Sequence, residues 1–463
     1  MPLLWVAVAV ALMLALLLAA KLDAFFALLL TALAVGLLNG MDVLEALRSV
    51  LRGVGNTLGS VALVLVFGAM LGRLVDESGA AHAITTRLVD AFGRARVPYA
   101  MALTGLLVGL PMLYNAGFLL LIPLVYAVAA ATGLPLVRVG VPLAAALSVT
   151  HGFLPPHPAP TFVAFAYGAD VNRTLLVGLV ATIPAILIGG IGFSRLLPAR
   201  GATEPPPGLF TPRATARADL PGLGVGLLVV LLPVLLMLVG SVVDVAMGTA
   251  ALDPMRADVD FAARLAETVP DAAGRRVVVA AKFLGNATVA LMLAVLLGVW
   301  LLGLRRGRTM DDVMKSLGAS AAAIATILLV IAAGGAFSQV LRDGGVAEWI
   351  AARATGLALD PLVLAFGVAA LLRLAVGSAT VAGMTTAGVM APMAAASGVR
   401  PELMVLATGA GSLMFSHFND TGFWMFKEYF GLTVRETLAT WSVMEMLVAL
   451  AGLGAALAIR ALA

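Results

Sequence analysis

The chain has 463 residues, of which 62% are hydrophobic and only 12% are charged. A soluble domain carries about 25% charged residues, so this composition indicates a polytopic membrane protein. The net charge of +4 is not accompanied by a basic patch with interleaved aromatic residues, and we expect no nucleic-acid partner. Because the chain has no cysteine and only four histidines, thiolate chemistry is excluded and no metal site is expected.

Membrane spans are predicted wherever about 20 mostly apolar residues can cross a hydrocarbon core of about 30 Å. The apolar start, residues 3–20, lacks a Lys/Arg-rich beginning and a cleavage site, so we interpret it as a retained span. Residues 41–53 are amphipathic and predict an interfacial helix. Residues 73–98 are polar and are predicted to lie on the cytoplasmic side. Further spans are expected at 24–38, 54–75, 139–168, 174–195, 222–243, 278–303, 316–340, 403–430 and 437–460.

One predicted span is interrupted between Ala145 and Thr161, where prolines, histidines and small polar residues gather. Proline removes a backbone donor and blocks the preceding turn, so no regular helix is expected through Leu154–Pro160. Irregular backbone at membrane depth is tolerated where it is buried in protein or lines a polar cavity. Such an interruption is typical of a transport site near the bilayer midplane.

Two apolar blocks predict re-entrant hairpins. Residues 99–131 are too many for one span and too few for two, and polar or helix-breaking residues in the middle place the tip near Asn115. Residues 362–396 form a similar block, broken at GSATVAGMTT (377–386). A further interruption, FSHFND (415–420), divides the span at 403–430.

The two halves of the chain resemble each other. Matching residues have the same separation throughout: Gly68–Gly79 with Gly334–Gly345, Gly117 with Gly383, and His151 with His417. A Pro- and Arg-rich linker, 198–221, separates a first repeat, 1–197, from a second, 222–463, and is predicted to be cytoplasmic. Because each half is expected to have five crossings plus a hairpin, the second repeat is inverted. The predicted fold is an all-α polytopic membrane protein of two inverted repeats with broken helices at the substrate site, as in secondary transporters.

The four polar interruptions are expected to converge, because they pair as repeats. Helix N-termini would then present free N–H groups and a positive dipole end, which favours a carboxylate substrate. Hydroxyl and amide side chains there could bind substrate hydroxyls or satisfy freed backbone groups. They are Ser148, Thr150, Ser378, Thr380, Ser416 and Asn419.

Five ionisable residues stand out in this apolar context. Arg373 needs a partner, either a substrate carboxylate or a compensating acid, unless it snorkels to the interface. Asp420 is predicted to carry a proton or bind substrate, and the alternative is a helix cap. His151 and His417 occupy repeat-related positions, and both are candidates for substrate binding. Lys282 is expected to snorkel.

Three stretches closely resemble the gluconate permease family, and the similarity covers nearly the full length: ALSVTHGFLPPHPAPT, LRLAVGSATVAG and FSHFNDTGFWMFKEYFGLTVRETLATWSVME. This resemblance implies a multi-pass protein of the bacterial inner membrane that imports gluconate or a related sugar acid with protons. The proton gradient would drive transport, and no cofactor is expected. The wider ion transporter superfamily implies a homodimer and an elevator-type movement within the lipid bilayer. Its sites, carried over by position, fall on Asn115–Gly117, Ser148–His151, Gly377–Thr380 and Ser416–Asp420.

One departure from the family bears on coupling. Gluconate carriers commonly have a glutamate where this chain has Asn115, and an amide cannot carry a proton. Either the coupling acid lies elsewhere, with Asp420 and His151 as candidates, or the substrate is another small acid such as glycerate or D-serine. Sodium coupling stays open. An enzyme is disfavoured because Ser148 and His151 have no third, orienting group.

Overall fold

The computed structural model describes residues 8–9, 11–13, 15–17, 19–198, 220–249, 252, 260–345, 359–417 and 420–462, and these residues form helices without strands. Nine helical stretches among them are long and apolar enough to cross a membrane. The predicted linker at 198–221 lies largely outside the described residues, and the predicted first span at 3–20 is described only in part. The inverted relation of the two halves stays a prediction.

The described part of the first half, from Ala24 on, contains nine α-helices. They are α2 (Ala24–Leu38), α3 (Val43–Glu77), α4 (Ala80–Phe92), α5 (Val97–Gly109), α6 (Tyr114–Thr132), α7 (Leu136–Phe153), α8 (Pro158–Tyr167), α9 (Val171–Ala185) and α10 (Phe193–Leu196), with a π-helical turn, η2 (Ile186–Gly192), between α9 and α10. Aspartate side chains cap several of the helices that follow short connections, as Asp23 does for α2 and Asp42 for α3.

The described part of the second half continues in the same manner. Its helices are α11 (Leu223–Ala246), α12 (Phe261–Thr268), α13 (Ala272–Leu284), α14 (Ala287–Gly298), α15 (Met310–Ala323), α16 (Ala325–Asp343), α18 (Pro361–Val376), α19 (Ala379–Ala396), α20 (Pro401–Gly411), α21 (Thr421–Phe430), α22 (Val434–Thr437) and α23 (Val443–Leu462). π-Helical turns extend α14 as η4 (Val299–Gly303) and lead into α23 as η6 (Leu438–Ser442).

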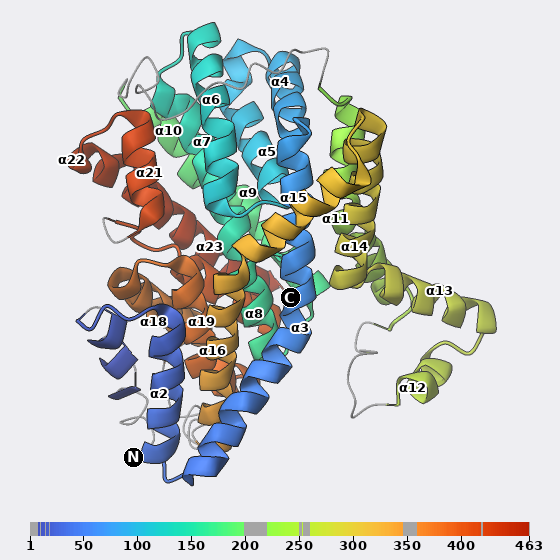
Figure 1. The fold of residues 1–463 in the computed structure, drawn as a ribbon, viewed down its shortest axis with the longest axis vertical. Helices are drawn as coiled ribbons and strands as arrows, with labels where there is room; N and C mark the ends of the chain where they lie inside the picture. The colour runs from blue at the N-terminus through green and yellow to red at the C-terminus, as the bar shows by residue number, and fades with distance from the viewer. Residues whose placement is uncertain are drawn as a thin grey trace.

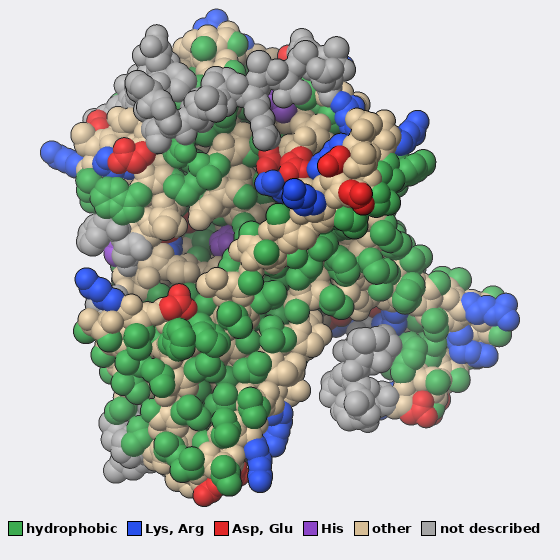
Figure 2. Space-filling model, in the orientation of Figure 1, with side chains coloured by type: hydrophobic (Ala, Val, Ile, Leu, Met, Phe, Trp, Pro, Cys, Tyr) green, Lys and Arg blue, Asp and Glu red, His purple; other side chains and the backbone are tan. Residues whose placement is uncertain are grey.

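The helices pack into one elongated body, from which α12 and α13 project as an arm (Figure 1). Hydrophobic side chains cover much of the lower surface, while acidic and basic side chains gather nearer the two ends and on the arm (Figure 2). Exposed apolar residues also run along α11 at Leu228, Leu235, Val239 and Val242. Such a surface matches lipid, because apolar groups exposed to water at this scale would be costly.

The predicted division between an interfacial helix at 41–53 and a span at 54–75 is wrong, because α3 is continuous. Gly53 does not break the helix; it allows close contact with α16. A Cβ atom on Gly53 would lie 2.6 Å from the carbonyl oxygen of Gly335. The polar segment at 73–98 is largely helical, since α3 reaches Glu77 and α4 fills most of the remainder.

Two other predicted spans are divided. The span at 278–303 breaks at Gly285, and Asn286 caps α14 by accepting a 3.0 Å hydrogen bond from the backbone N–H of Thr288. The span at 316–340 divides at Ile324 into α15 and α16. Lys282 was expected to extend its ammonium group to the membrane interface. In the structure it forms an ion pair, because its Nζ lies 2.7 Å from Oδ1 of Asp244 on α11.

The interruptions are present but shorter than predicted. α7 continues to Phe153 and α8 begins at Pro158, because proline is tolerated in the first turn of a helix. α18 and α19 are separated only by Gly377, which has a φ of 76°, and Ser378. Asn115 lies in the first turn of α6, just after the tip that joins α5 to α6.

Candidate functional site

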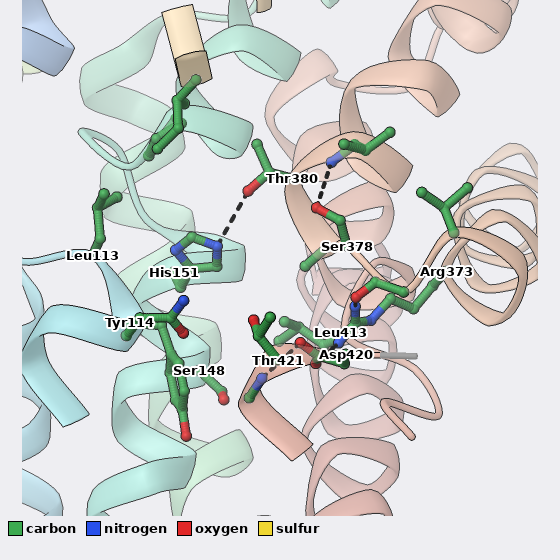
Figure 3. A pocket seen from close by; sticks show the side chains of 18 of the residues that line it. Leu113, Tyr114, Ser148, His151, Arg373, Ser378, Thr380, Leu413, Asp420 and Thr421 are labelled. Atoms are coloured by element: carbon green, nitrogen blue, oxygen red, sulfur yellow. Dashed lines mark hydrogen bonds and ion pairs between the residues drawn. The ribbon is translucent and has the colours of Figure 1, made fainter. Parts of the chain in front are cut away.

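A cavity of about 560 Å³ lies where helices from the two halves meet. In Figure 3, Tyr114, Ser148 and His151 face Thr380 and Asp420 across this space. Polar residues lining it are Tyr114, Asn115, Ser148, His151, Thr326, Arg373, Ser378, Thr380, Asp420, Thr421, Trp441 and Glu445. Seven of the predicted site residues therefore share one cavity: Asn115, Ser148, His151, Arg373, Ser378, Thr380 and Asp420.

Four helices begin at the cavity, since first-turn residues of α6, α8, α19 and α21 line it. Ser378 caps α19 and Asp420 caps α21, whereas no side chain caps α6. The first backbone N–H groups of a helix lack intrahelical partners. The start of α6 therefore offers N–H donors and a positive dipole end to an anion, as the sequence predicted.

Arg373 and Asp420 form a buried ion pair at one wall of the cavity. The exposed fractions of their side chains are only 3% and 14%. The Arg373 guanidinium also donates to the carbonyl oxygen of Gly377. Asp420 accepts from Ser416 Oγ and, at 2.9 Å, from the backbone N–H of Gly422. Of the alternatives for Arg373, the structure therefore contains the compensating acid, and Asp420 also acts as the predicted helix cap.

His151 lies on α7 at the opposite wall. Its Nε2 is 3.3 Å from Thr380 Oγ1, within hydrogen-bond distance, and its Nδ1 is buried without a partner. The neighbouring His157 packs edge-on against it and donates from Nε2 to the carbonyl oxygen of Gly109 at 2.8 Å. His157 therefore fixes the break after α7 to the hairpin tip, while His151 faces the cavity.

The sequence did not identify Glu445, a fully buried acid on α23 that lines the cavity. Ser148 Oγ donates to one of its carboxylate oxygens, and the other has no hydrogen-bond partner. One turn earlier, Trp441 Nε1 donates to Ser416 Oγ at 2.7 Å. An acid in an apolar span is costly and usually functional. Like Arg373, Glu445 is an ionisable residue in an apolar stretch of the sequence, and the cost of burying its charge would have pointed to it, although it lies outside the interrupted segments.

A family model described as GntP family permease matches residues 1–462. The chain belongs to the GntP permease family. This GntP permease is 46% identical over 461 residues to the "Gnt-II system L-idonate transporter" of Escherichia coli (strain K12), covering 100% of this chain and 99% of that protein. It is 43% identical over 454 residues to a "High-affinity gluconate transporter" of the same strain, covering 98% of each. The predicted family is confirmed, and a permease rather than an enzyme is confirmed with it.

A solved structure supports the fold. The permease matches the YdaH transporter of Alcanivorax borkumensis with a TM-score of 0.62 at 20% identity, covering 94% of this chain and 97% of that one. The all-helical membrane architecture is therefore shared with a transporter of distant sequence.

Some predicted site residues of the permease do not line the cavity. Gly117 faces α7, where an added Cβ would lie 3.0 Å from Leu147. Thr150 is buried and donates to the carbonyl oxygen of Leu147 at 2.8 Å. Ser416 is buried behind Asp420 and holds that carboxylate in place. His417 is also absent from the lining residues, and Asn419 lies outside the described residues.

Proposed function

We propose that this permease is a secondary active transporter that imports gluconate or a related sugar acid by proton symport across the bacterial inner membrane. The observation that carries the proposal is the cavity where four helix N-termini meet between the two halves of the chain. Its volume of about 560 Å³ is within the roughly 300–1,000 Å³ typical of small-molecule sites. The names of the L-idonate and gluconate relatives support a sugar acid as the substrate.

The cavity has separate groups for the two ends of such a molecule. The uncapped start of α6 suits the carboxylate, because backbone N–H groups and the helix dipole favour an anion there. Asn115, Ser148 and Thr380 are neutral, and they suit a chain of hydroxyl groups. Arg373 adds positive potential but is already paired with Asp420, so the pair contributes little net charge.

We further propose that the protein forms a homodimer and moves its substrate by an elevator-type displacement of the helices around the cavity. This follows from the resemblance to the ion transporter superfamily and from the position of the cavity between helices of the two halves. Chemical cross-linking in membranes, followed by mass measurement, tests the dimer independently of transport.

The decisive experiment is uptake of labelled gluconate into proteoliposomes with an inward proton gradient and no sodium. Gradient-dependent accumulation that saturates, with L-idonate but not D-serine competing, supports the proposal. Accumulation that requires a sodium gradient would replace proton coupling with sodium coupling. Absence of gluconate uptake, with uptake of D-serine or glycerate by the same preparation, would overturn the proposed substrate class.

A further inference from the structure

Glu445 has an environment unlike that of the other acid in the cavity. Its side chain is 1% exposed, and its hydrogen bond in the described structure comes from the neutral Ser148 hydroxyl. The second carboxylate oxygen is buried and has no hydrogen-bond partner among the described residues. A buried carboxylate that lacks a bonded cation carries a large desolvation cost when ionised, and binding a proton removes that cost. Asp420, by contrast, has its charge matched by Arg373 in a direct ion pair.

The charged and titratable groups around Glu445 come from several elements. Arg373 on α18 and Asp420 before α21 act on it with opposite sign. Tyr114 on α6 and His151 on α7 line the same cavity. Because Arg373 and Asp420 largely cancel, an ionised Glu445 leaves the cavity with one uncompensated negative charge.

The other helices packed against α23 bring charges only at their starts. Arg138, Arg173 and Glu402 lie in the first turns of α7, α9 and α20. The π-helical turns η2 and η6 contain no charged residue. No cation on these elements therefore neutralises Glu445 at the cavity.

We infer that Glu445 carries the coupling proton and that its protonation admits the anionic substrate to the cavity. This inference rests on the proposed symport function and moves the coupling role from Asp420 and His151, which the sequence suggested. With Glu445 ionised, a substrate carboxylate meets a like charge; with Glu445 protonated, the same site is neutral and the acid can donate a hydrogen bond to the substrate. Proton and substrate therefore strengthen each other's binding by the same factor, as linkage requires. Both are then carried together.

The first test measures gluconate affinity of the full-length protein in detergent from pH 5.5 to 8.5. We expect wild-type affinity to fall about tenfold per pH unit once Glu445 ionises, because one proton is linked to one anion. Glu445→Gln should bind gluconate with the affinity that the wild-type protein has at low pH, and this affinity should not change with pH. Glu402→Gln is the matched control, since it removes another buried glutamate, 5% exposed and not among the lining residues, and should titrate like wild type.

Transport assays distinguish a loss of proton coupling from a loss of substrate movement. In proteoliposomes, Glu445→Gln should exchange labelled for unlabelled gluconate yet fail to accumulate it when a proton gradient is imposed. Proton-driven accumulation by Glu445→Gln would overturn the inference. Loss of the pH dependence in Asp420→Asn but not in Glu445→Gln would place the proton on Asp420 instead. If wild-type protein neither binds nor transports gluconate, the proposed function fails rather than the assignment of the proton.

A measurement on the unmutated protein covers the case in which Glu445→Gln does not fold. A carbodiimide adds to protonated carboxyl groups in apolar surroundings, and peptide mass analysis locates the adduct. We expect labelling at Glu445 that decreases as pH rises and that gluconate blocks, with little labelling at the ion-paired Asp420. Labelling of Asp420 in preference to Glu445 would contradict the inference.

Discussion

Arg373 at the end of α18 and Asp420 at the start of α21 form a buried ion pair that joins two interrupted segments of the second half. The two residues are far apart in sequence, and each lies at a break where backbone groups also need partners. Their pairing therefore fixes one wall of the cavity as well as compensating two charges.

We expect Asp420→Asn to lower the free energy of unfolding by about 3–5 kcal/mol, because it leaves Arg373 buried without an acid. The amide oxygen can still cap α21 through the Gly422 N–H, so the change isolates the charge. The double variant Arg373→Met with Asp420→Asn should lose less, since no uncompensated charge remains. Thermal unfolding in detergent measures both, and equal losses in the single and double variants would contradict this account.

Ser416 and Trp441 are expected to act together on Asp420. Trp441 Nε1 donates to Ser416 Oγ, which in turn donates to the Asp420 carboxylate. Trp441→Phe and Ser416→Ala should each weaken gluconate binding by up to about tenfold, since a buried hydrogen bond is worth about 1 kcal/mol. The double variant should be no weaker than the worse single one. Calorimetric affinities test this, and strictly additive losses would show that the two residues act separately.

Gly409 on α20 lies at a close contact between α20 and α7. A Cβ atom there would collide with the carbonyl oxygen of Gly152 on α7. Gly409→Ala should therefore destabilise the protein by about 1–3 kcal/mol through overpacking. Gly367 on α18 has open space where an added Cβ atom would lie, and it provides the control. Gly367→Ala should leave stability unchanged or raise it by up to about 1 kcal/mol, and thermal unfolding distinguishes the two variants.

Asn115 gives a test of the anion site at the start of α6. Asn115→Glu introduces the acid that gluconate carriers commonly have at this position, and it should make gluconate binding weaker at neutral pH than at low pH, because its ionised carboxylate would compete for the positive helix end. Lowering the pH should restore affinity as the new acid is protonated. Asn115→Gln, which adds length without charge, should stay within a few-fold of wild type. Comparable losses in the two variants would indicate a steric effect in place of an electrostatic one.

The sequence located the cavity residues that interrupt apolar segments, because a polar or proline-rich break at membrane depth has few structural explanations. Asn115, His151, Ser378 and Asp420 were found by this argument, and the structure places them in one cavity. Glu445 was missed because it lies within an uninterrupted helix. Its access to the cavity depends on how α23 is rotated against α7, which is a tertiary relationship.

Some helix boundaries could likewise be predicted from the sequence, and others depend on tertiary contacts. The span α11 follows directly from its apolar length, whereas the apolar helix α2 has only 15 residues and is shorter than the candidate spans. The continuity of α3 could not be predicted, because Gly53 can end a helix or let two helices approach closely, and only the contact with Gly335 decides between them. The break before Asn286 has the same origin, since the cap it provides competes with continuation of the helix.

The 35-residue α3 would extend about 52 Å at the ordinary helical rise, well beyond a hydrocarbon core of about 30 Å. It touches α16 at Gly53 and α14 near Leu74, so it connects two distant parts of the body. Gly55, Gly59 and Gly68 have open space where a side chain would sit, so packing does not require glycine there. Because glycine weakens a helix, we expect these positions to determine how easily α3 bends. We therefore expect α3 to bend between its contacts with α16 and α14, so that one end can shift while the other stays in place.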